Sequence, residues 1–171
     1  GLLIFILSSL VRQDSLKELG IRLDNLYESG RECGVISMIL IVIILFFSIF
    51  YSEKSYPLGV ISYLGAFSKN TPWGITKRII EGIAQQFLLQ SVFLIRLLQI
   101  FGKKPISMIG AALLFSLAHS PNIGLMFLSF IFGLMVCVLF LRNRNIFALG
   151  IMHGVLSIVF ILFLVPRLVG D

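Results

Sequence analysis

The chain has 171 residues, of which 58% are hydrophobic and only 13% are charged, and its mean hydropathy is +1.02. A soluble domain carries about 25% charged residues, so this composition excludes an ordinary soluble protein. The net charge of +6 does not indicate nucleic-acid binding, because the basic residues form no stripe on a soluble face. We therefore predict an all-α fold, a polytopic transmembrane helix bundle, with the lipid bilayer as its surroundings and no nucleic-acid partner.

Residues 1–33 are predicted to form an N-terminal apolar stretch and a connector. Residues 1–10 are apolar and begin without a methionine, which is consistent with the remnant of a longer helix. Residues 12–33 interleave leucines with charges of both signs, as is typical of a partly helical segment at the membrane surface. Residues 34–171 then form the predicted transmembrane bundle.

Five apolar stretches within this region are candidates for membrane helices. They are residues 34–51, 79–101, 106–119, 123–141 and 146–165. A spanning helix needs roughly 20 mostly apolar residues, so the stretch 106–119 is short for a complete span. Residues 52–70 contain a proline, glycines and several aromatic residues, which favours a loop or a re-entrant segment in the headgroup layer.

Three of these stretches carry polar side chains at membrane depth, where such groups are costly and often mark a functional site. On each of the three, two polar or aromatic residues lie four apart and so share one helix face. The pairs are Gln86 and Gln90, Phe115 and His119, and His153 and Ser157. A bundle that turns these faces inward joins them in one polar chamber.

The residues next to each histidine indicate where that histidine lies in its helix. Gly150 and Gly154 flank His153 in a small-xxx-small pattern, which allows a neighbouring helix to approach closely. Pro121 disfavours helical geometry at the residue before it, so His119 is expected in the last turn of its helix. Either histidine can alternatively serve as an interhelical hydrogen-bond donor that specifies packing alone.

The order of these residues resembles the CPBP family of CAAX-protease and bacteriocin-processing membrane proteins, also called the Abi family. That family carries the motifs EExxxR, FxxxH and HxxxN on separate helices. Here FxxxH is Phe115 to His119, and HxxxN is His153 to Ser157 with serine in place of asparagine. The first motif is replaced by Gln85, Gln86 and Gln90. The resemblance covers about residues 74–163.

The resemblance implies a metal-independent intramembrane endopeptidase without a cofactor, in a bacterial-type inner (plasma) membrane. In such enzymes the first glutamate is taken to activate a water with help from the histidines, while the later histidine and asparagine stabilise the oxyanion. A glutamine amide cannot accept that proton near neutral pH, so the first catalytic motif is degenerate. Gln86 and Gln90 are instead expected to hydrogen-bond to each other.

Glu81 is the carboxylate nearest to this motif in the sequence. It lies four residues before Gln85, on the same helix face, and is a candidate substitute base. An ion pair with Lys77, four residues earlier, explains Glu81 equally well without catalysis. A zinc site made of both histidines and Glu81 is a third arrangement, although the resemblance implies no metal.

Two functions follow from this pattern. The first is a membrane endopeptidase of the CPBP type that cleaves a peptide or membrane-protein substrate. Its candidate catalytic residues are His119, His153, Gln85, Gln86 and Glu81, with Phe115, Gln90 and Ser157 supporting the pocket. The second is a catalytically inactive family member that binds the other subunits of a membrane complex. A transporter would need paired broken helices, which the sequence does not show.

Overall fold

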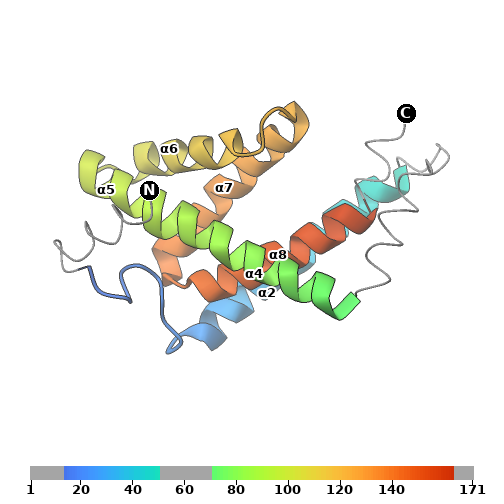
Figure 1. Ribbon diagram of the computed structural model, residues 1–171, viewed down its shortest axis with the longest axis horizontal. Coiled ribbons are helices and arrows are strands. Elements are labelled where there is room, and N and C mark those ends of the chain that lie inside the picture. The colour runs from blue at the N-terminus through green and yellow to red at the C-terminus, as the bar shows by residue number, and fades with distance from the viewer. Residues whose placement is uncertain (1–13, 51–70, 164–171) are drawn as a thin grey trace.

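A computed structural model describes residues 14–50 and 71–163, and every regular element in these two ranges is a helix (Figure 1). The elements are α2 (Leu26–Phe50), α4 (Thr71–Gln86), η1 (Phe87–Leu94), α5 (Ile95–Phe101), α6 (Lys104–Leu117), α7 (Ile123–Asn143) and α8 (Ile146–Phe163). The predicted apolar stretch 1–10 and the predicted loop 52–70 lie outside the described residues.

Four segments are long and apolar enough to cross a membrane, judged by length and composition. They are Leu26–Ser48, Pro72–Phe101, Ile123–Asn143 and Ile146–Phe163. The fifth apolar helix, α6, has 14 residues and is shorter than a full span, as its sequence predicted. The all-helical membrane bundle is therefore confirmed, and the chain is an integral, multi-pass membrane protein.

Two helices differ from their predicted form. α2 begins at Leu26 rather than at residue 34, so the end of the predicted connector is already the start of a membrane helix. The second span is interrupted by η1, a π-helix that begins directly after Gln86 and contains Gln90. The apolar pattern of the sequence predicted a continuous α-helix here. π-helical turns inside α-helices are frequent at functional sites.

α8 lies between α4 and α2 and contacts both helices (Figure 1). α6 packs along α7, and both of these helices also contact η1. The second span therefore links the two halves of the bundle: α4 lies against α8, and η1 lies against α6 and α7. This arrangement brings the polar faces of three helices toward one region.

Glycines allow α4 and α8 to cross with their backbones in contact. A Cβ atom built on Gly82 would lie 2.8 Å from the Gly154 nitrogen, and one built on Gly154 would lie 2.8 Å from the Ile79 Cα atom. One built on Gly150 would lie 2.5 Å from the Ile83 Cα atom. The close crossing predicted from Gly150 and Gly154 is thus confirmed, with Gly82 as a third glycine on the opposing helix.

The connector preceding α2 is docked onto the bundle. Leu19 is buried, and its carbonyl oxygen accepts a hydrogen bond of 2.6 Å from Ser91 Oγ in η1. Gly20 adopts a φ of +79°, a conformation that favours glycine, and its carbonyl oxygen accepts a 3.0 Å bond from the Ile146 nitrogen at the start of α8. These bonds attach the connector to the elements that carry the polar residues.

A polar cluster joins the start of α2 to the turn between α7 and α8. We call its three residues, Asn25, Asn143 and Asn145, the asparagine belt. Asn145 Nδ2 donates to Asn25 Oδ1 at 2.8 Å and to the Arg22 carbonyl oxygen at 3.1 Å. Asn145 Oδ1 accepts a 3.0 Å bond from the Ala148 nitrogen in the first turn of α8. Asn25 Nδ2 donates to the Asn143 carbonyl oxygen at 2.6 Å. The belt thereby fixes where α8 begins.

Candidate functional site

The polar chamber lies where α4 and η1 face α8. Gln86 is completely buried, and its Nε2 atom lies 3.1 Å from His153 Nδ1. Gln90, also completely buried, donates from Nε2 to Gln86 Oε1 at 3.2 Å. The predicted bond between the two glutamines is thus confirmed. We call Gln90, Gln86 and His153 the glutamine–histidine chain.

Aromatic rings connect this chain to the second histidine. The Phe115 ring centroid lies 5.0 Å from that of His119 and 5.9 Å from that of His153, in edge-on arrangements. His119 Nδ1 lies 2.9 Å from the Phe115 carbonyl oxygen, just beyond the end of α6 at Leu117. Phe132 of α7 packs against His153 at 5.0 Å between ring centroids. Residues from α4, α6 and α7 therefore surround the imidazole of His153 on α8.

The helices that carry Gln85, His119 and His153 do meet, as the sequence predicted. The side chain that reaches His153 from α4 is Gln86, however, and not Gln85. Gln85 and Ser157 are half-buried, and in the part of the chain that the structure describes neither makes a side-chain hydrogen bond to the glutamine–histidine chain. Successive helix residues point about 100° apart, so only one glutamine of the adjacent pair can face α8.

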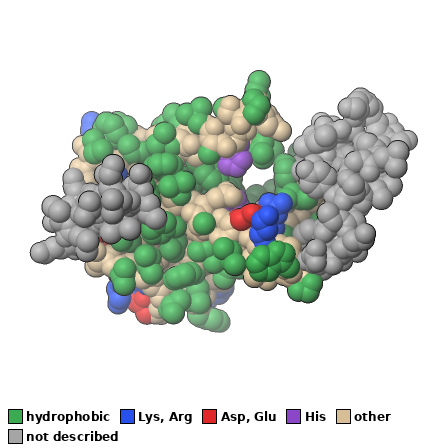
Figure 2. All heavy atoms as spheres, in the orientation of Figure 1, with side chains coloured by type: hydrophobic (Ala, Val, Ile, Leu, Met, Phe, Trp, Pro, Cys, Tyr) green, Lys and Arg blue, Asp and Glu red, His purple; other side chains and the backbone are tan. Residues whose placement is uncertain are grey.

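Glu81 lies outside the glutamine–histidine chain and is held by two cations. Its Oε2 atom is 3.1 Å from Arg78 Nη1, and its Oε1 atom is 3.8 Å from Lys77 Nζ. The ion pair with Lys77 is thus confirmed, and Arg78 is an additional partner. Figure 2 shows acidic and basic side chains gathered over α4 on one edge of a hollow, with a histidine on the opposite edge. The role of Glu81 as a base stays a prediction.

The histidines and Glu81 do not assemble into a zinc site. Within residues 14–50 and 71–163, no group of three His, Cys, Asp or Glu side chains is arranged to hold a metal ion. The Nδ1 atoms of both histidines bond to protein groups, and the Glu81 carboxylate is engaged by Arg78 and Lys77.

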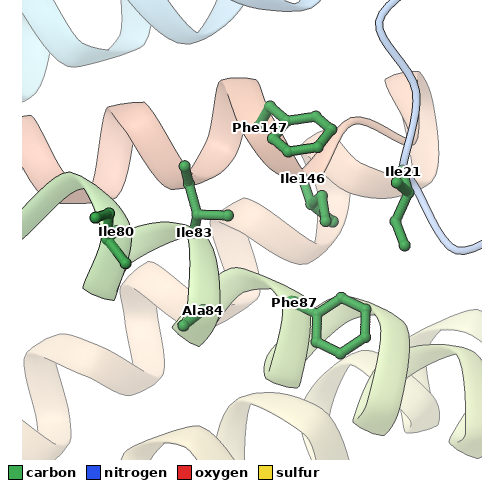
Figure 3. A pocket seen from close by; sticks show the side chains of 7 residues that line it. All are labelled: Ile21, Ile80, Ile83, Ala84, Phe87, Ile146 and Phe147. Carbon is green, nitrogen blue, oxygen red and sulfur yellow. The ribbon is translucent and has the colours of Figure 1, made fainter. Parts of the chain in front are cut away.

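A separate groove of about 450 Å³ runs between the connector, α4, η1 and the start of α8 (Figure 3). It is lined by Ile21, Ile80, Ile83, Ala84, Phe87, Ile146 and Phe147. Binding sites for specific ligands combine apolar walls with a few polar groups that fix orientation. This groove is lined by apolar side chains alone and offers no polar side chain that would orient a ligand.

Sequence reasoning missed two contributors to the site. Phe132 is one of 16 phenylalanines, and its spacing does not distinguish it from the others. Gly82 did carry a signal, because it lies four residues before Gln86 and therefore shares the face that meets α8. A glycine one turn from a polar residue in an apolar helix marks a place where another helix approaches that residue.

The geometry can now be compared with known proteins. The family model described as Type II CAAX prenyl endopeptidase Rce1-like matches residues 67–159, more than half of the 171 residues. The chain belongs to this family. The match confirms the resemblance drawn from the order of the motifs, and it includes Gln86, Phe115 and His153. No curated protein and no solved structure matches the chain.

The chamber of this Rce1-like protein has a defined chemical capacity. Its amides and imidazoles can donate and accept hydrogen bonds within an apolar bundle, where such bonds are strong. The glutamine amides cannot take up a proton from water near neutral pH, whereas a neutral imidazole can. What the site can do therefore depends on which imidazole nitrogens carry a lone pair.

Proposed function

We propose that this protein binds a peptide segment of a membrane-associated substrate or partner at the glutamine–histidine chain and does not hydrolyse it by a carboxylate base. The proposed location is a bacterial-type inner membrane. One observation carries the proposal: the first-motif side chain that reaches His153 is Gln86, a buried amide that is also bonded to Gln90. A general base must accept a proton near the operating pH, and an amide does not.

A peptide is the ligand that the site fits best. The family of the chain is one of endopeptidases, which must hold an extended peptide beside their catalytic groups. Both histidines bond to the protein through Nδ1, and in the described ranges no protein group is hydrogen-bonded to either Nε2 atom. Each Nε2 atom is therefore available to a peptide carbonyl oxygen or a peptide N–H group.

Reconstituted protein in lipid nanodiscs tests this function with a fluorescent farnesylated peptide of the CAAX type. We expect saturable binding by fluorescence anisotropy and, by mass spectrometry, no product above the protein-free control. The triple variant Gln85→Glu, Gln86→Glu, Gln90→Arg carries the full EExxxR pattern. It should gain hydrolysis by about 10²- to 10⁴-fold over background, the contribution expected of a general base. Gln90→Arg alone is the matched control, because it adds no carboxylate that could act as the base, and it should stay inactive.

A second candidate function, an endopeptidase with a histidine base, is favoured by the bond between His119 Nδ1 and the Phe115 carbonyl oxygen. A carbonyl oxygen only accepts, so His119 donates there and carries its lone pair on Nε2, where it can accept a proton from water. Turnover by the unaltered protein that is lost in His119→Gln would establish this function. Turnover that is lost in Glu81→Gln would assign the base to Glu81 instead. Either result overturns the proposal of a silent binding site.

A further inference from the structure

The direction of each hydrogen bond determines which nitrogen of each imidazole carries the proton. Gln90 Nε2 donates to Gln86 Oε1 at 3.2 Å, so the carbonyl end of Gln86 faces Gln90. The amide nitrogen of Gln86 is then the end that faces His153, 3.1 Å from Nδ1. An NH₂ group only donates, so His153 Nδ1 accepts and the ring proton is on Nε2.

The opposite direction along this chain is disfavoured. It would have His153 donate to Gln86 and Gln86 donate to Gln90, which would turn the NH₂ group of Gln90 to the present place of Oε1, where no hydrogen-bond partner lies among the described residues. The observed direction leaves one acceptor, Gln90 Oε1, without a partner among the described residues. Gln90 is completely buried, and an unpartnered buried N–H donor is rarer in proteins than an under-used carbonyl oxygen. The donors therefore run from Gln90 through Gln86 to His153.

We propose that Gln90 and Gln86 are positioning residues that hold His153 in its Nε2–H form, so that it donates a hydrogen bond to a carbonyl oxygen of the bound peptide. The assignment of the peptide as the ligand rests on the proposed function, whereas the protonation of His153 stands on the hydrogen bonds alone. A fixed donor recognises a neutral peptide carbonyl group. The two glutamines thereby have a task of their own, because a carboxylate at position 86 would place a proton on Nδ1 of His153.

Gln86→Glu is the substitution that reverses this effect. A carboxylate only accepts hydrogen bonds, so His153 must then donate to it from Nδ1. His153 either moves its proton to Nδ1 or becomes an imidazolium with both nitrogens protonated. In both cases Nδ1 changes from a bare nitrogen to an N–H group. Gln85→Glu adds the same charge one residue away, at a side chain that is not hydrogen-bonded to His153 in the described part of the chain, and is the matched control.

¹⁵N NMR reads this difference directly, because the chain contains only two histidines. Protein labelled with ¹⁵N-histidine in nanodiscs gives two imidazole ring systems, and His119→Phe assigns them. In the unaltered protein we expect the bare nitrogen of His153 to be Nδ1 and that of His119 to be Nε2. Gln86→Glu should protonate Nδ1 of His153, and Gln85→Glu should leave it bare.

A proton on Nδ1 of His153 in the unaltered protein would overturn the proposal, and this result needs no variant. An equal response of His153 to Gln86→Glu and Gln85→Glu would overturn it as well. If Gln86→Glu does not fold, Gln86→Leu replaces it: without the amide donor, the population of the Nε2–H form of His153 should fall to the modest intrinsic preference that a free neutral imidazole has for this form. An equal population of the Nε2–H form in Gln86→Leu and in the unaltered protein would contradict the proposed role of Gln86.

The carbonyl contact is tested with the same farnesylated peptide. His153→Asn keeps an oxygen that can accept from Gln86 but has no group at the position of Nε2. It should bind the peptide roughly 3- to 10-fold more weakly, the loss expected for one net hydrogen bond. Unchanged affinity would overturn the carbonyl contact. If the unaltered protein binds no peptide while Gln86→Glu still protonates Nδ1 of His153, the proposed function fails. The role of Gln90 and Gln86 in fixing the proton of His153 then stands by itself.

Discussion

The asparagine belt, with one buried and two half-buried asparagines, and the glutamine–histidine chain, with two buried glutamines, are both built from amides, but they differ in how completely the protein uses them. In the belt, Asn25 and Asn145 each use both the oxygen and the nitrogen of the side chain in bonds within the protein. In the glutamine–histidine chain, Gln90 Oε1 has no partner among the described residues. Buried polar groups are normally satisfied, so the unused acceptor of Gln90 supports the proposed ligand site, whereas the belt uses its amides within the protein.

This difference leads to opposite expectations for stability. A fully satisfied amide cannot be removed without leaving its partners unsatisfied, and each such buried group costs about 1–3 kcal/mol. An amide that is itself incompletely satisfied has less to lose when an apolar side chain of similar volume replaces it. The asparagine belt should therefore contribute most to the stability of the fold. The glutamine–histidine chain should contribute most to ligand binding.

The largest loss of stability is expected for Asn145→Ala. This variant removes the acceptor for the Ala148 nitrogen and leaves the Arg22 carbonyl oxygen and Asn25 Oδ1 without their donor. The free energy of unfolding should fall by about 2–4 kcal/mol, measured by denaturant titration in detergent micelles. Asn122→Ala is the control, because Asn122 caps α7 through one exposed bond to the Leu125 nitrogen and should cost about 1 kcal/mol. Equal losses would remove the special role of the belt.

A smaller loss is expected for Gly82→Ala, which acts on the crossing that holds the glutamine–histidine chain together. The added methyl group would lie 2.8 Å from the Gly154 nitrogen, so α4 and α8 must separate at a cost of about 1–3 kcal/mol. The same shift should lengthen the Gln86–His153 hydrogen bond and change the ¹⁵N shift of His153 Nδ1.

Gly34→Ala in α2 is the matched control for this crossing, because nothing lies within 4 Å of its Cβ position. It should be neutral or stabilising by up to about 1 kcal/mol, as expected for alanine in place of a helix-interior glycine. Equal changes in the free energy of unfolding for Gly82→Ala and Gly34→Ala would show that the crossing of α4 and α8 is not tight.

The smallest effect on stability is expected for Gln90→Leu. It leaves the buried Gln86 Oε1 atom without its donor, but it also removes the unpartnered oxygen of Gln90, so the two effects offset each other. Leucine is apolar and of similar volume. The free energy of unfolding should change by less than about 1 kcal/mol in either direction, in the same denaturant titration. A loss as large as that of Asn145→Ala would show that the two amide clusters do not differ as the comparison requires.

The sequence by itself determined the membrane character, the helical fold and the family. These properties depend on composition, on the length of apolar stretches and on the order of short motifs, all of which are local along the chain. The bond between Gln86 and Gln90 was also accessible, because residues four apart on a helix are neighbours whatever the helix packs against. The glycines at 150 and 154 correctly marked a close crossing beside His153.

Only the tertiary structure decided which side chains meet. The sequence could not choose between Gln85 and Gln86, because periodicity defines the faces of a helix but not the direction in which each face points. That direction was set by backbone contact between Gly82 on α4 and the glycines of α8, which turns Gln86 toward His153 and leaves Glu81 with Arg78 and Lys77. The packing of α7 and of the connector likewise decided that Phe132 lies beside His153 and that Leu19 is buried. Contacts between residues far apart in the chain are formed by packing, and no local pattern encodes the angle at which two helices cross.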